Sequence, residues 1–159
     1  LGGNLGRIEE TFSSARSMLA GDDNISLLKS SRLYRSSPMG PQDQPDYLNA
    51  ALLVSTALSP LLLLRRLQAI ELDHGRNRET RRWGERTLDL DLIAYDHVQM
   101  TTEELILPHP GTTERLFVLQ PLCDIQPHWQ HPATGMRADA LLQQLIHNGA
   151  SQLAEGVIW

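Results

Sequence analysis

Apolar residues recur at helical spacing near the start of the chain. Ile8, Phe12, Ala15 and Leu19 are separated by three or four positions, so they would line one face of a helix. Gly21 follows directly and is a typical stop signal at a helix C-terminus. We therefore expect an amphipathic helix that begins near Ile8 and ends at Gly21.

A second helical pattern lies in the middle of the chain. The pair Ser59-Pro60 combines a favourable N-cap with a proline suited to the first turn of a helix. Leu63, Leu67 and Ile70 then supply an apolar stripe, and Gly75 marks its end. The pattern predicts a second amphipathic helix over this region.

Other stretches favour extended structure. Hydrophobic and polar residues alternate most strictly from Leu88 to Tyr95, which is the clearest strand pattern in the sequence. The expected strands are 25–36, 47–58 and 88–95, with a further apolar run at 105–107. Three prolines and a glycine make 38–46 a loop. A short helical or irregular stretch then reaches Leu122, and apolar spacing over 139–147 predicts a closing helix.

These elements mix strands and helices without a regular β–α–β alternation. Such an order favours an α+β sandwich with a mostly antiparallel sheet flanked by helices. With 159 residues and 17.8 kDa, the chain fits a single domain, 1–159, that can bury a sizeable core. The sequence contains no internal repeat, low-complexity tract or interdomain linker.

Composition and charge narrow the class of protein. Hydrophobic residues make up 41% and charged residues 21%, as in soluble globular proteins. The net charge of -5 argues against a nucleic-acid partner, which would need a basic face. The run Leu61–Leu64 is far too short to span a bilayer, so no membrane partner is expected. The lone Cys123 cannot form an internal disulfide, which favours a core position and a reducing, cytoplasmic compartment.

Asp89 and Asp91 stand two positions apart within the alternating stretch. On a strand, such residues point to the same side, about 6.6 Å apart along the chain, while the leucines between them face the opposite side. Two adjacent carboxylates repel each other unless a cation neutralises them, and oxygen ligands of this kind suit Mg²⁺. Taken alone, the pair is explained equally well as the solvated face of a strand.

An arginine-rich segment, 76–86, directly precedes the acidic pair. It has no apolar period, is predicted to be an exposed, mobile loop, and contains Arg76, Arg78, Arg81, Arg82 and Arg86. Guanidinium groups grip phosphate oxygens bidentately and keep their charge. An arginine loop on its own is more often a solvated surface. Beside a carboxylate pair of the Mg²⁺ type, it indicates phosphoryl transfer.

Further polar residues are candidates for nucleotide or substrate contacts. No Gly-x-x-x-x-Gly-Lys-Ser/Thr motif occurs, which excludes a P-loop enzyme. Tyr47 and Asn49 share a strand face that would suit a flat, hydrogen-bonding heterocycle. A tyrosine on a half-buried strand, however, more often packs against its neighbours than binds a ligand. Gln68 and Glu71 lie on the polar side of the second helix and could contact an adenosine. Polar residues on the exposed side of a helix, however, commonly bind no ligand. His109 is held between two prolines and could reach phosphates.

Two longer stretches are distinctive. They read Gly-Pro-Gln-Asp-Gln-Pro-Asp-Tyr-Leu-Asn-Ala-Ala over 40–51 and Arg-Trp-Gly-Glu-Arg-Thr-Leu-Asp-Leu-Asp over 82–91. Both resemble the signature segments of the 6-hydroxymethyl-7,8-dihydropterin pyrophosphokinases (HPPK) of folate biosynthesis. Further matches in the family's order are Gly2-x-Asn4-Leu5, Glu71-x-x-x-Gly75-Arg76 and Pro108-His109-Pro110 through Arg115-x-Phe117. The similarity covers nearly the whole chain.

The resemblance implies a ferredoxin-like α+β monomer. It also implies diphosphate transfer from ATP to 6-hydroxymethyl-7,8-dihydropterin, with two Mg²⁺ ions, giving AMP and the pterin diphosphate. Positions that match catalytic residues are Asp89 and Asp91, which also match the metal ligands, together with Arg76 and Arg86. Positions that match ATP-binding residues are Gln68, Glu71, Arg78, Arg82, Trp83, Leu92, His109 and Arg115. Positions that match the pterin pocket are Ser36, Met39, Tyr47, Asn49 and Phe117.

Some features depart from the family pattern. Glu104 and Ile106 stand where a bacterial relative carries an arginine and a threonine near the nucleotide, so contacts there would differ. Gly2–Gly6 by itself indicates only a tight turn, and because the family begins with a central strand, we expect one to precede Leu1 in the natural protein. Two rival functions stay open: another Mg²⁺-dependent phosphotransferase or nuclease, and a non-catalytic nucleotide sensor.

Overall fold

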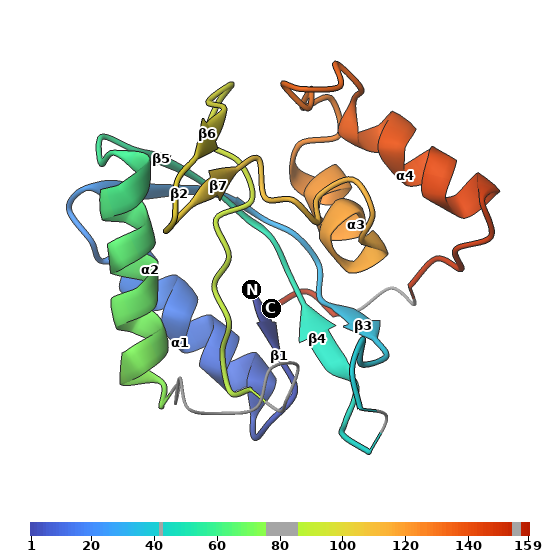
Figure 1. Ribbon diagram of the computed structural model, residues 1–159. Helices are drawn as coiled ribbons and strands as arrows, with labels where there is room; N and C mark the ends of the chain where they lie inside the picture. The colour runs from blue at the N-terminus through green and yellow to red at the C-terminus, as the bar shows by residue number, and fades with distance from the viewer. Residues whose placement is uncertain (42, 76–85, 154–156) are drawn as a thin grey trace.

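The computed structural model describes residues 1–41, 43–75, 86–153 and 157–159. In chain order its elements are β1 (Gly2–Gly3), α1 (Ile8–Ala20), β2 (Ile25–Ser30), β3 (Tyr34–Ser36), β4 (Tyr47–Asn49), β5 (Leu52–Thr56), α2 (Pro60–Asp73), β6 (Met100–Thr101), β7 (Ile106–Leu107), α3 (Leu116–Ile125) and α4 (Ala138–His147). Figure 1 shows the strands running between a pair of helices on either side. The α+β class with antiparallel sheets is confirmed. Within the described ranges, no helix is long and apolar enough to cross a membrane.

The central strands form a long antiparallel ribbon. β2 pairs with β5, with Ile25 opposite Thr56, and β3 pairs with β4, with Tyr34 opposite Asn49. β1 adds to the free side of β4, where Gly2 lies opposite Asn49. Asn49 therefore has a strand on each side, which places it in the middle of the sheet.

The strands expected over 25–36 and 47–58 are present, but each is divided in two. The two breaks face each other at Ser31 and Ala51. Ser31 N donates to Ala51 O at 2.9 Å, and Ala51 N donates to the Ser31 hydroxyl oxygen at 2.8 Å. Because a side-chain oxygen replaces a backbone acceptor, the pairing continues through hydrogen bonds although the regular ladder stops.

The strand expected over 88–95 does not form a ladder, which corrects the sequence prediction. The alternation itself is right, since Leu88 and Leu90 are buried between more exposed neighbours. The segment, which is described throughout, has one isolated bridge, in which Asp89 and Gly2 exchange N–H···O bonds of 2.8 and 2.9 Å. A ladder needs a neighbour of similar length, and β1, the neighbour at this point, has two residues.

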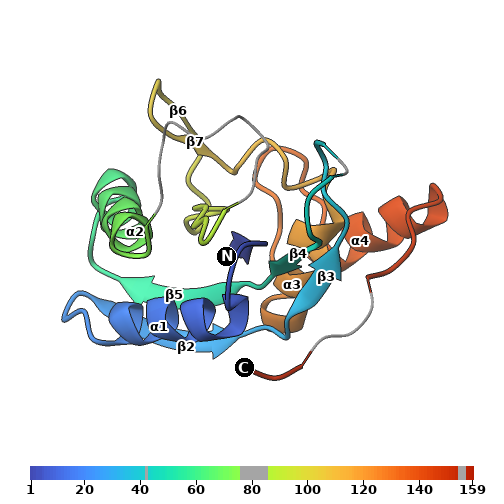
Figure 2. The same ribbon diagram turned by 90° about the horizontal axis from the view of Figure 1, so that it is seen from below.

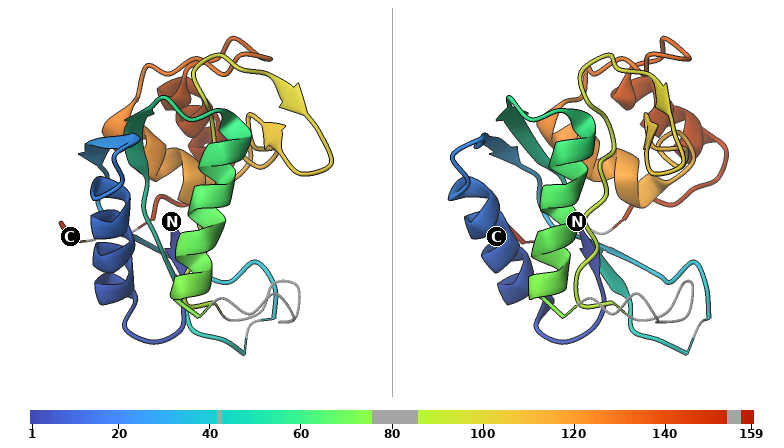
Figure 3. Two further views of the ribbon diagram at one scale, coloured as in Figure 1. Left: turned by 90° about the vertical axis from the view of Figure 1, so that its left-hand side faces the viewer. Right: turned by 60° about the vertical axis from the view of Figure 1, so that its left-hand side comes forward.

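The main core lies between α1, α2 and the ribbon. Phe12 of α1 and Leu63 of α2 are buried in one cluster with Leu33, Leu88 and Leu90. Figures 1 and 3 show α1 and α2 beside each other, on the side of the molecule away from α3 and α4. The core therefore reaches from the first helix to the leucines that flank Asp89.

Both sequence-predicted amphipathic helices in the first half of the chain are confirmed. α1 ends before Gly21, and its buried residues are those of the predicted stripe. Ser59 is the N-cap of α2, and its hydroxyl oxygen accepts a hydrogen bond from Leu62 N at 3.4 Å. α2 ends at Asp73, and Gly75 adopts a φ of 79°, a left-handed conformation that favours glycine.

α3 and α4 pack on each other around a second apolar cluster. Figure 2 shows these two helices at the far end of the molecule from α2. Leu119 of α3 and Leu141 and Leu142 of α4 are its buried members. The Tyr34 hydroxyl of β3 bonds to both carboxylate oxygens of Asp124 at 2.8 and 2.9 Å, which ties α3 to the ribbon. The helix predicted over 139–147 is confirmed. The stretch that reaches Leu122, expected to be helical or irregular, is helical from Leu116.

Residues 157–159 return to α1. The Trp159 ring meets Phe12 edge-on with centroids 5.8 Å apart, and Trp159 Nε1 donates to Ser31 O at 2.9 Å. The guanidinium carbon of Arg16 lies 4.7 Å from the indole centroid. This segment therefore covers part of the main core next to α1.

Candidate active site

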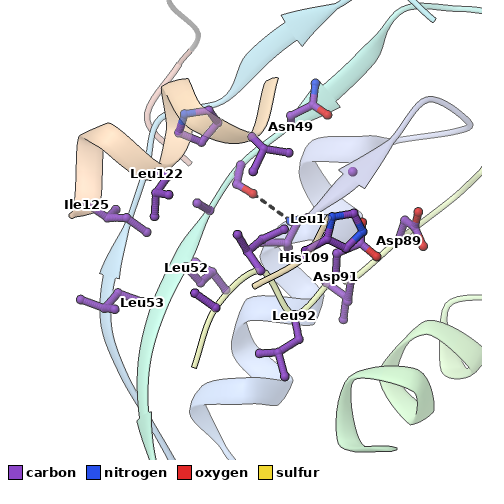
Figure 4. Close-up of a pocket in the computed structure, with 18 of the residues that line it drawn as sticks. Leu1, Asn49, Leu52, Leu53, Asp89, Asp91, Leu92, His109, Leu122 and Ile125 are labelled. Atoms are coloured by element: carbon purple, nitrogen blue, oxygen red, sulfur yellow. Dashed lines mark hydrogen bonds between the residues drawn. The ribbon is translucent and has the colours of Figure 1, made fainter. Parts of the chain in front are cut away.

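A pocket with a volume of about 830 Å³ lies beside the acidic pair. Its walls come from β4 and β5, the extended segment after Leu88, the loop at His109, and α3. Figure 4 shows Asp89, Asp91 and His109 on one side of this pocket and Leu53 and Ile125 on the other. The pocket therefore has a charged side and an apolar side.

The backbone of the acidic segment is held in place from two directions. Asp89 exchanges its backbone hydrogen bonds with Gly2, and Leu90 N donates to Glu71 Oε1 at 2.7 Å. Glu71 is 1% exposed, so this acceptor lies inside the protein. Sequence analysis placed Glu71 on the polar side of its helix, and the structure corrects that placement. Contacts with α2 and with β1 thus fix the backbone that carries the two aspartates.

The two carboxylates differ in their surroundings. Asp89 Oδ2 lies 2.5 Å from Arg86 Nη1, and both side chains are largely covered. Asp91 is exposed. Hard oxygen donors of this kind fit Mg²⁺, which commonly takes one or two carboxylates and completes its shell with phosphate oxygens and water. In the described part of the chain, no cluster of three or more His, Cys, Asp or Glu side chains could hold a metal alone.

A histidine and an arginine face the same pocket from the loop before α3. His109 Nδ1 accepts a hydrogen bond from Gly111 N at 3.0 Å, so the proton of the neutral ring is assigned to Nε2, which can donate to a ligand. A methyl group on Gly111 would come within 2.4 Å of Arg115 Nε, so the Arg115 side chain would have to move to accommodate one. The Arg115 guanidinium carbon lies 5.9 Å from the Phe117 ring centroid.

The amide of Asn49 is oriented by its neighbours. Its Nδ2 donates to Tyr34 O at 3.2 Å and to the Ser36 hydroxyl oxygen at 2.9 Å, and the residue is 5% exposed. These two bonds use both N–H groups and leave Oδ1 as an acceptor. Tyr47 from β4 and Phe117 from α3 line the same pocket. The arrangement suits a planar ligand with N–H donors at its edge.

The pocket gathers most of the described candidate residues. Those that line it are Ser36, Met39, Tyr47, Asn49, Arg86, Asp89, Asp91, Leu92, His109, Arg115 and Phe117. Gln68 and Glu71 do not line it. Arg76, Arg78, Arg82 and Trp83 lie outside the described residues.

Glu104, one of the two departures expected from the sequence, is connected through Arg65 to Gln68. Gln68 Oε1 accepts a hydrogen bond from Arg65 Nη1 at 3.1 Å, and Arg65 also forms an ion pair with Glu104. Ile106 is 43% exposed on β7. Glu104 therefore engages an arginine of α2, in a cluster that includes the candidate adenosine contact.

Sequence reasoning missed the part played by Asn4. It lies in a glycine-rich stretch that indicates a turn, yet it is 5% exposed and its side chain forms three hydrogen bonds. A polar residue at a turn normally faces water, so no local pattern marks it. The match of Gly2-x-Asn4-Leu5 to a family segment was the available signal.

The fold and the pocket together define a class of protein. Carboxylates and an imidazole lie on one side of a pocket whose other side is apolar, and two guanidinium groups also line it. Such a combination is typical of enzymes that transfer phosphorus-containing groups to a small organic acceptor.

Comparison with known proteins identifies the family. The family described as 7,8-dihydro-6-hydroxymethylpterin-pyrophosphokinase (HPPK) matches residues 1–127. The chain therefore belongs to the HPPK family, as the sequence resemblance predicted. Its reaction is the pyrophosphokinase step of folate biosynthesis, in which ATP and hydroxymethyldihydropterin are the substrates.

Several relatives carry the name 2-amino-4-hydroxy-6-hydroxymethyldihydropteridine pyrophosphokinase. The protein of Haemophilus influenzae is 46% identical over 125 residues, which cover 79% of this chain and 78% of the relative. That of Bacillus subtilis is 40% identical over 139 residues, which cover 87% and 83%. That of Pseudomonas aeruginosa is 41% identical over 153 residues, which cover 96% and 93%. The rival functions considered from the sequence are thereby set aside.

Proposed function

We propose that ATP and 6-hydroxymethyl-7,8-dihydropterin bind together in this pocket, with the phosphates beside Asp89 and Asp91 and the pterin between Tyr47 and Phe117. One observation carries the proposal: residues suited to phosphate and residues suited to a flat heterocycle line a single pocket. A direct transfer between two substrates needs this proximity, because the reacting atoms must come within about 3–3.5 Å of each other.

The pterin ring is recognised by stacking and by hydrogen bonds at its edge. Tyr47 and Phe117 supply aromatic faces. Asn49 Oδ1, which its neighbours leave free to accept, takes N–H groups of the pterin. Ser36 and Met39, which also line the pocket, offer backbone groups to the same ring.

Asp89 and Asp91 would hold the Mg²⁺ that accompanies ATP, as two ions. When bound, these ions neutralise phosphate charge and lower the pKa of the attacking hydroxyl group. The Arg86 guanidinium lies against Asp89 and can exchange this partner for a phosphate oxygen. Support for this assignment comes from the donor chemistry of the pair and from its buried anchor at Glu71.

The remaining candidates hold and orient ATP. His109, through Nε2–H, and Arg115 donate to phosphate oxygens, and Leu92 packs against the nucleotide. Gln68 and Glu71 act near the adenosine, Glu71 by positioning Leu90. Arg76, Arg78, Arg82 and Trp83 lie outside the described residues; we assign them to closing over the triphosphate, with Arg76 supporting transfer.

The pterin hydroxymethyl oxygen attacks the β-phosphorus of ATP. A bond forms between that oxygen and the β-phosphorus, and the bond from the β-phosphorus to the oxygen bridging the α- and β-phosphates breaks. AMP leaves with the bridging oxygen, and the hydroxyl proton passes to solvent. Arg86 stabilises the charge that develops on the transferred group.

Oligomeric state and compartment belong to the same proposal: one domain, 1–159, that acts as a cytoplasmic monomer without a nucleic-acid or membrane partner. The net charge of -5 disfavours nucleic-acid binding, and a single cysteine suits a reducing compartment. Analytical ultracentrifugation at micromolar concentration tests the monomer, and a sedimentation coefficient of a dimer contradicts it.

Product analysis tests the function itself. The purified protein is mixed with ATP, Mg²⁺ and 6-hydroxymethyl-7,8-dihydropterin, and nucleotides are separated by chromatography. We expect AMP and the pterin diphosphate in equal amounts, and no AMP when the pterin is left out. ADP as the product, or AMP formed without pterin, contradicts the proposal.

A further inference from the structure

Asn4 connects two loops that lead into the pocket. Its Nδ2 donates to Gln44 Oε1 and to Pro45 O, both at 3.0 Å, and its Oδ1 accepts a hydrogen bond from Arg86 N at 2.9 Å. Its backbone N also donates to Arg86 O at 2.9 Å. The amide of one residue, 5% exposed, therefore uses both N–H groups and its oxygen on segments 40 or more positions away.

These two segments lead into the two halves of the site. Gln44 and Pro45 lie three and two residues before β4, which carries Tyr47 and Asn49. Arg86 is three residues from Asp89, with which it forms an ion pair. The Asn4 side chain forms hydrogen bonds to both of these loops and thereby joins them.

The backbone around Asn4 is fitted closely to the acidic side. A methyl group on Gly3 would come within 2.7 Å of Thr87 O, a distance that side-chain carbons do not tolerate. Gly3 thus lets residues 2–4 lie directly against 86–89, where Gly2 bridges Asp89. Backbone contacts therefore fix the position of Asn4 relative to the aspartates. The hydrogen bonds of its side-chain amide then fix Gln44 and Pro45 relative to Asn4.

We propose that Asn4 is a positioning residue for diphosphate transfer, which fixes the distance between the pterin side and the phosphate side of the pocket. The inference rests on the function proposed above. Each half-site keeps its own ligand groups when Asn4 is removed, so each substrate still binds. Alignment of the hydroxymethyl oxygen with the β-phosphorus is lost, and a displacement of about 1 Å in such an alignment can cost about 10²-fold in rate.

The test compares Asn4→Ala with wild type in steady-state kinetics and in calorimetric titrations with the pterin and with a non-hydrolysable ATP analogue. We expect kcat to fall at least about tenfold, while the Kd of each ligand measured alone stays within about threefold. Asn24→Ala, an exposed asparagine in the turn before β2, is the matched control and keeps wild-type kcat.

Gln44 supplies the second variant, in case Asn4→Ala does not fold. Gln44→Ala removes one acceptor of the Asn4 amide, whereas Gln44→Glu keeps an acceptor oxygen there. A severalfold lower kcat in Gln44→Ala that Gln44→Glu restores supports the inference. An unchanged kcat in Asn4→Ala and Gln44→Ala, or a kcat loss matched by weaker binding of one substrate alone, overturns it. If wild type forms no AMP, the proposed function fails before the role of Asn4 is tested.

Discussion

The Asp91 side chain is exposed in the pocket, whereas the backbone beside it is held by hydrogen bonds. Its neighbours Leu90 and Asp89 are held by Glu71 and Gly2, whereas the Asp91 carboxylate itself is exposed. Substitutions of Asp91 therefore change the ligand groups of the pocket without removing an anchor of the backbone.

Asp91→Asn tests the role of this carboxylate. The substitution keeps the size of the side chain but removes its charge, so the affinity for Mg²⁺ falls, and we expect kcat to drop by about 10²-fold or more. Kinetics over a range of Mg²⁺ concentrations measure the effect, with Asp23→Asn, an exposed aspartate that does not line the pocket, as the control. Wild-type turnover of Asp91→Asn at low Mg²⁺ contradicts the assigned role.

Cys123 makes a prediction about chemical reactivity. Burial raises the pKa of its thiol from 9.0 to about 11, because the thiolate loses solvation among the residues around α3. At pH 8 its thiolate is about 100-fold scarcer than that of a thiol with the unshifted value. We expect iodoacetamide to modify Cys123 slowly in the folded protein and rapidly in guanidinium chloride. Equal rates in the two states would show that the thiol is not protected.

At the scale of elements, α2 acts as the support of the acidic segment. Glu71 of this helix is buried, and its carboxylate accepts a hydrogen bond from Leu90 N at 2.7 Å. The carboxylate takes the place that a neighbouring strand would have in a ladder. The extended segment over 88–95 is thereby held although it lacks regular strand pairing.

Glu71→Leu removes this acceptor and leaves the buried N–H of Leu90 unpaired. Such a group costs about 1–3 kcal/mol, so we expect the free energy of unfolding to fall by about 2 kcal/mol relative to Glu71→Gln, which keeps an acceptor oxygen. Urea denaturation measures both variants. If the two have the same midpoint, the bond to Leu90 does not stabilise the fold.

The elements also show which parts of the fold local patterns predict. α1 and α2 follow from the spacing of Phe12, Leu63 and similar residues, because a helix closes its hydrogen bonds within itself. The prediction of a strand over 88–95 was wrong, because a regular strand depends on a neighbouring strand that its own alternation does not specify. The break at Ser31 likewise depends on Ala51, twenty positions away.

At the scale of the whole molecule, residues at the end of the sequence pack against α1. Trp159 packs on Phe12 and Arg16 and donates to Ser31 O, so it joins α1 to the break between β2 and β3. These contacts lie beside the main core, and neither Trp159 nor the two residues of α1 that it contacts line the pocket. Their loss affects the stability of the molecule and leaves the residues of the pocket in place.

Trp159→Ala is expected to lower the free energy of unfolding by about 2 kcal/mol, less than for a fully buried tryptophan, because the indole is half-buried. Trp159→Phe keeps the ring contact with Phe12 and loses the bond to Ser31 O, so it should lose about 1 kcal/mol. Thermal unfolding checks both values, with the Kd of ATP as a control that should not change. An unchanged melting temperature in Trp159→Ala contradicts the packing role.

The stability of the molecule should also depend on pH through His131. Burial lowers the pKa of this histidine below 6.5, and its Nδ1 accepts backbone N–H groups of Ala133 and Thr134 at 3.3 Å. As pH falls through 6.5, the unfolded chain takes up the proton first, so stability present above that pH is lost below it. We expect urea midpoints from pH 7.5 to 5 to fall less steeply in His131→Asn than in wild type. Parallel profiles would exclude His131 as a source of the dependence.

The sequence by itself determined the helices, the burial of Leu88 and Leu90, and the chemical groups of the site. These features depend on periodicity and on residue type, which are local. Only the tertiary structure decided that Glu71 faces inward, that 88–95 is held by single bonds, and that Asn4 joins two distant loops. Each of these depends on hydrogen bonds between residues far apart in the chain, whose partners are chosen by the packing of the whole molecule.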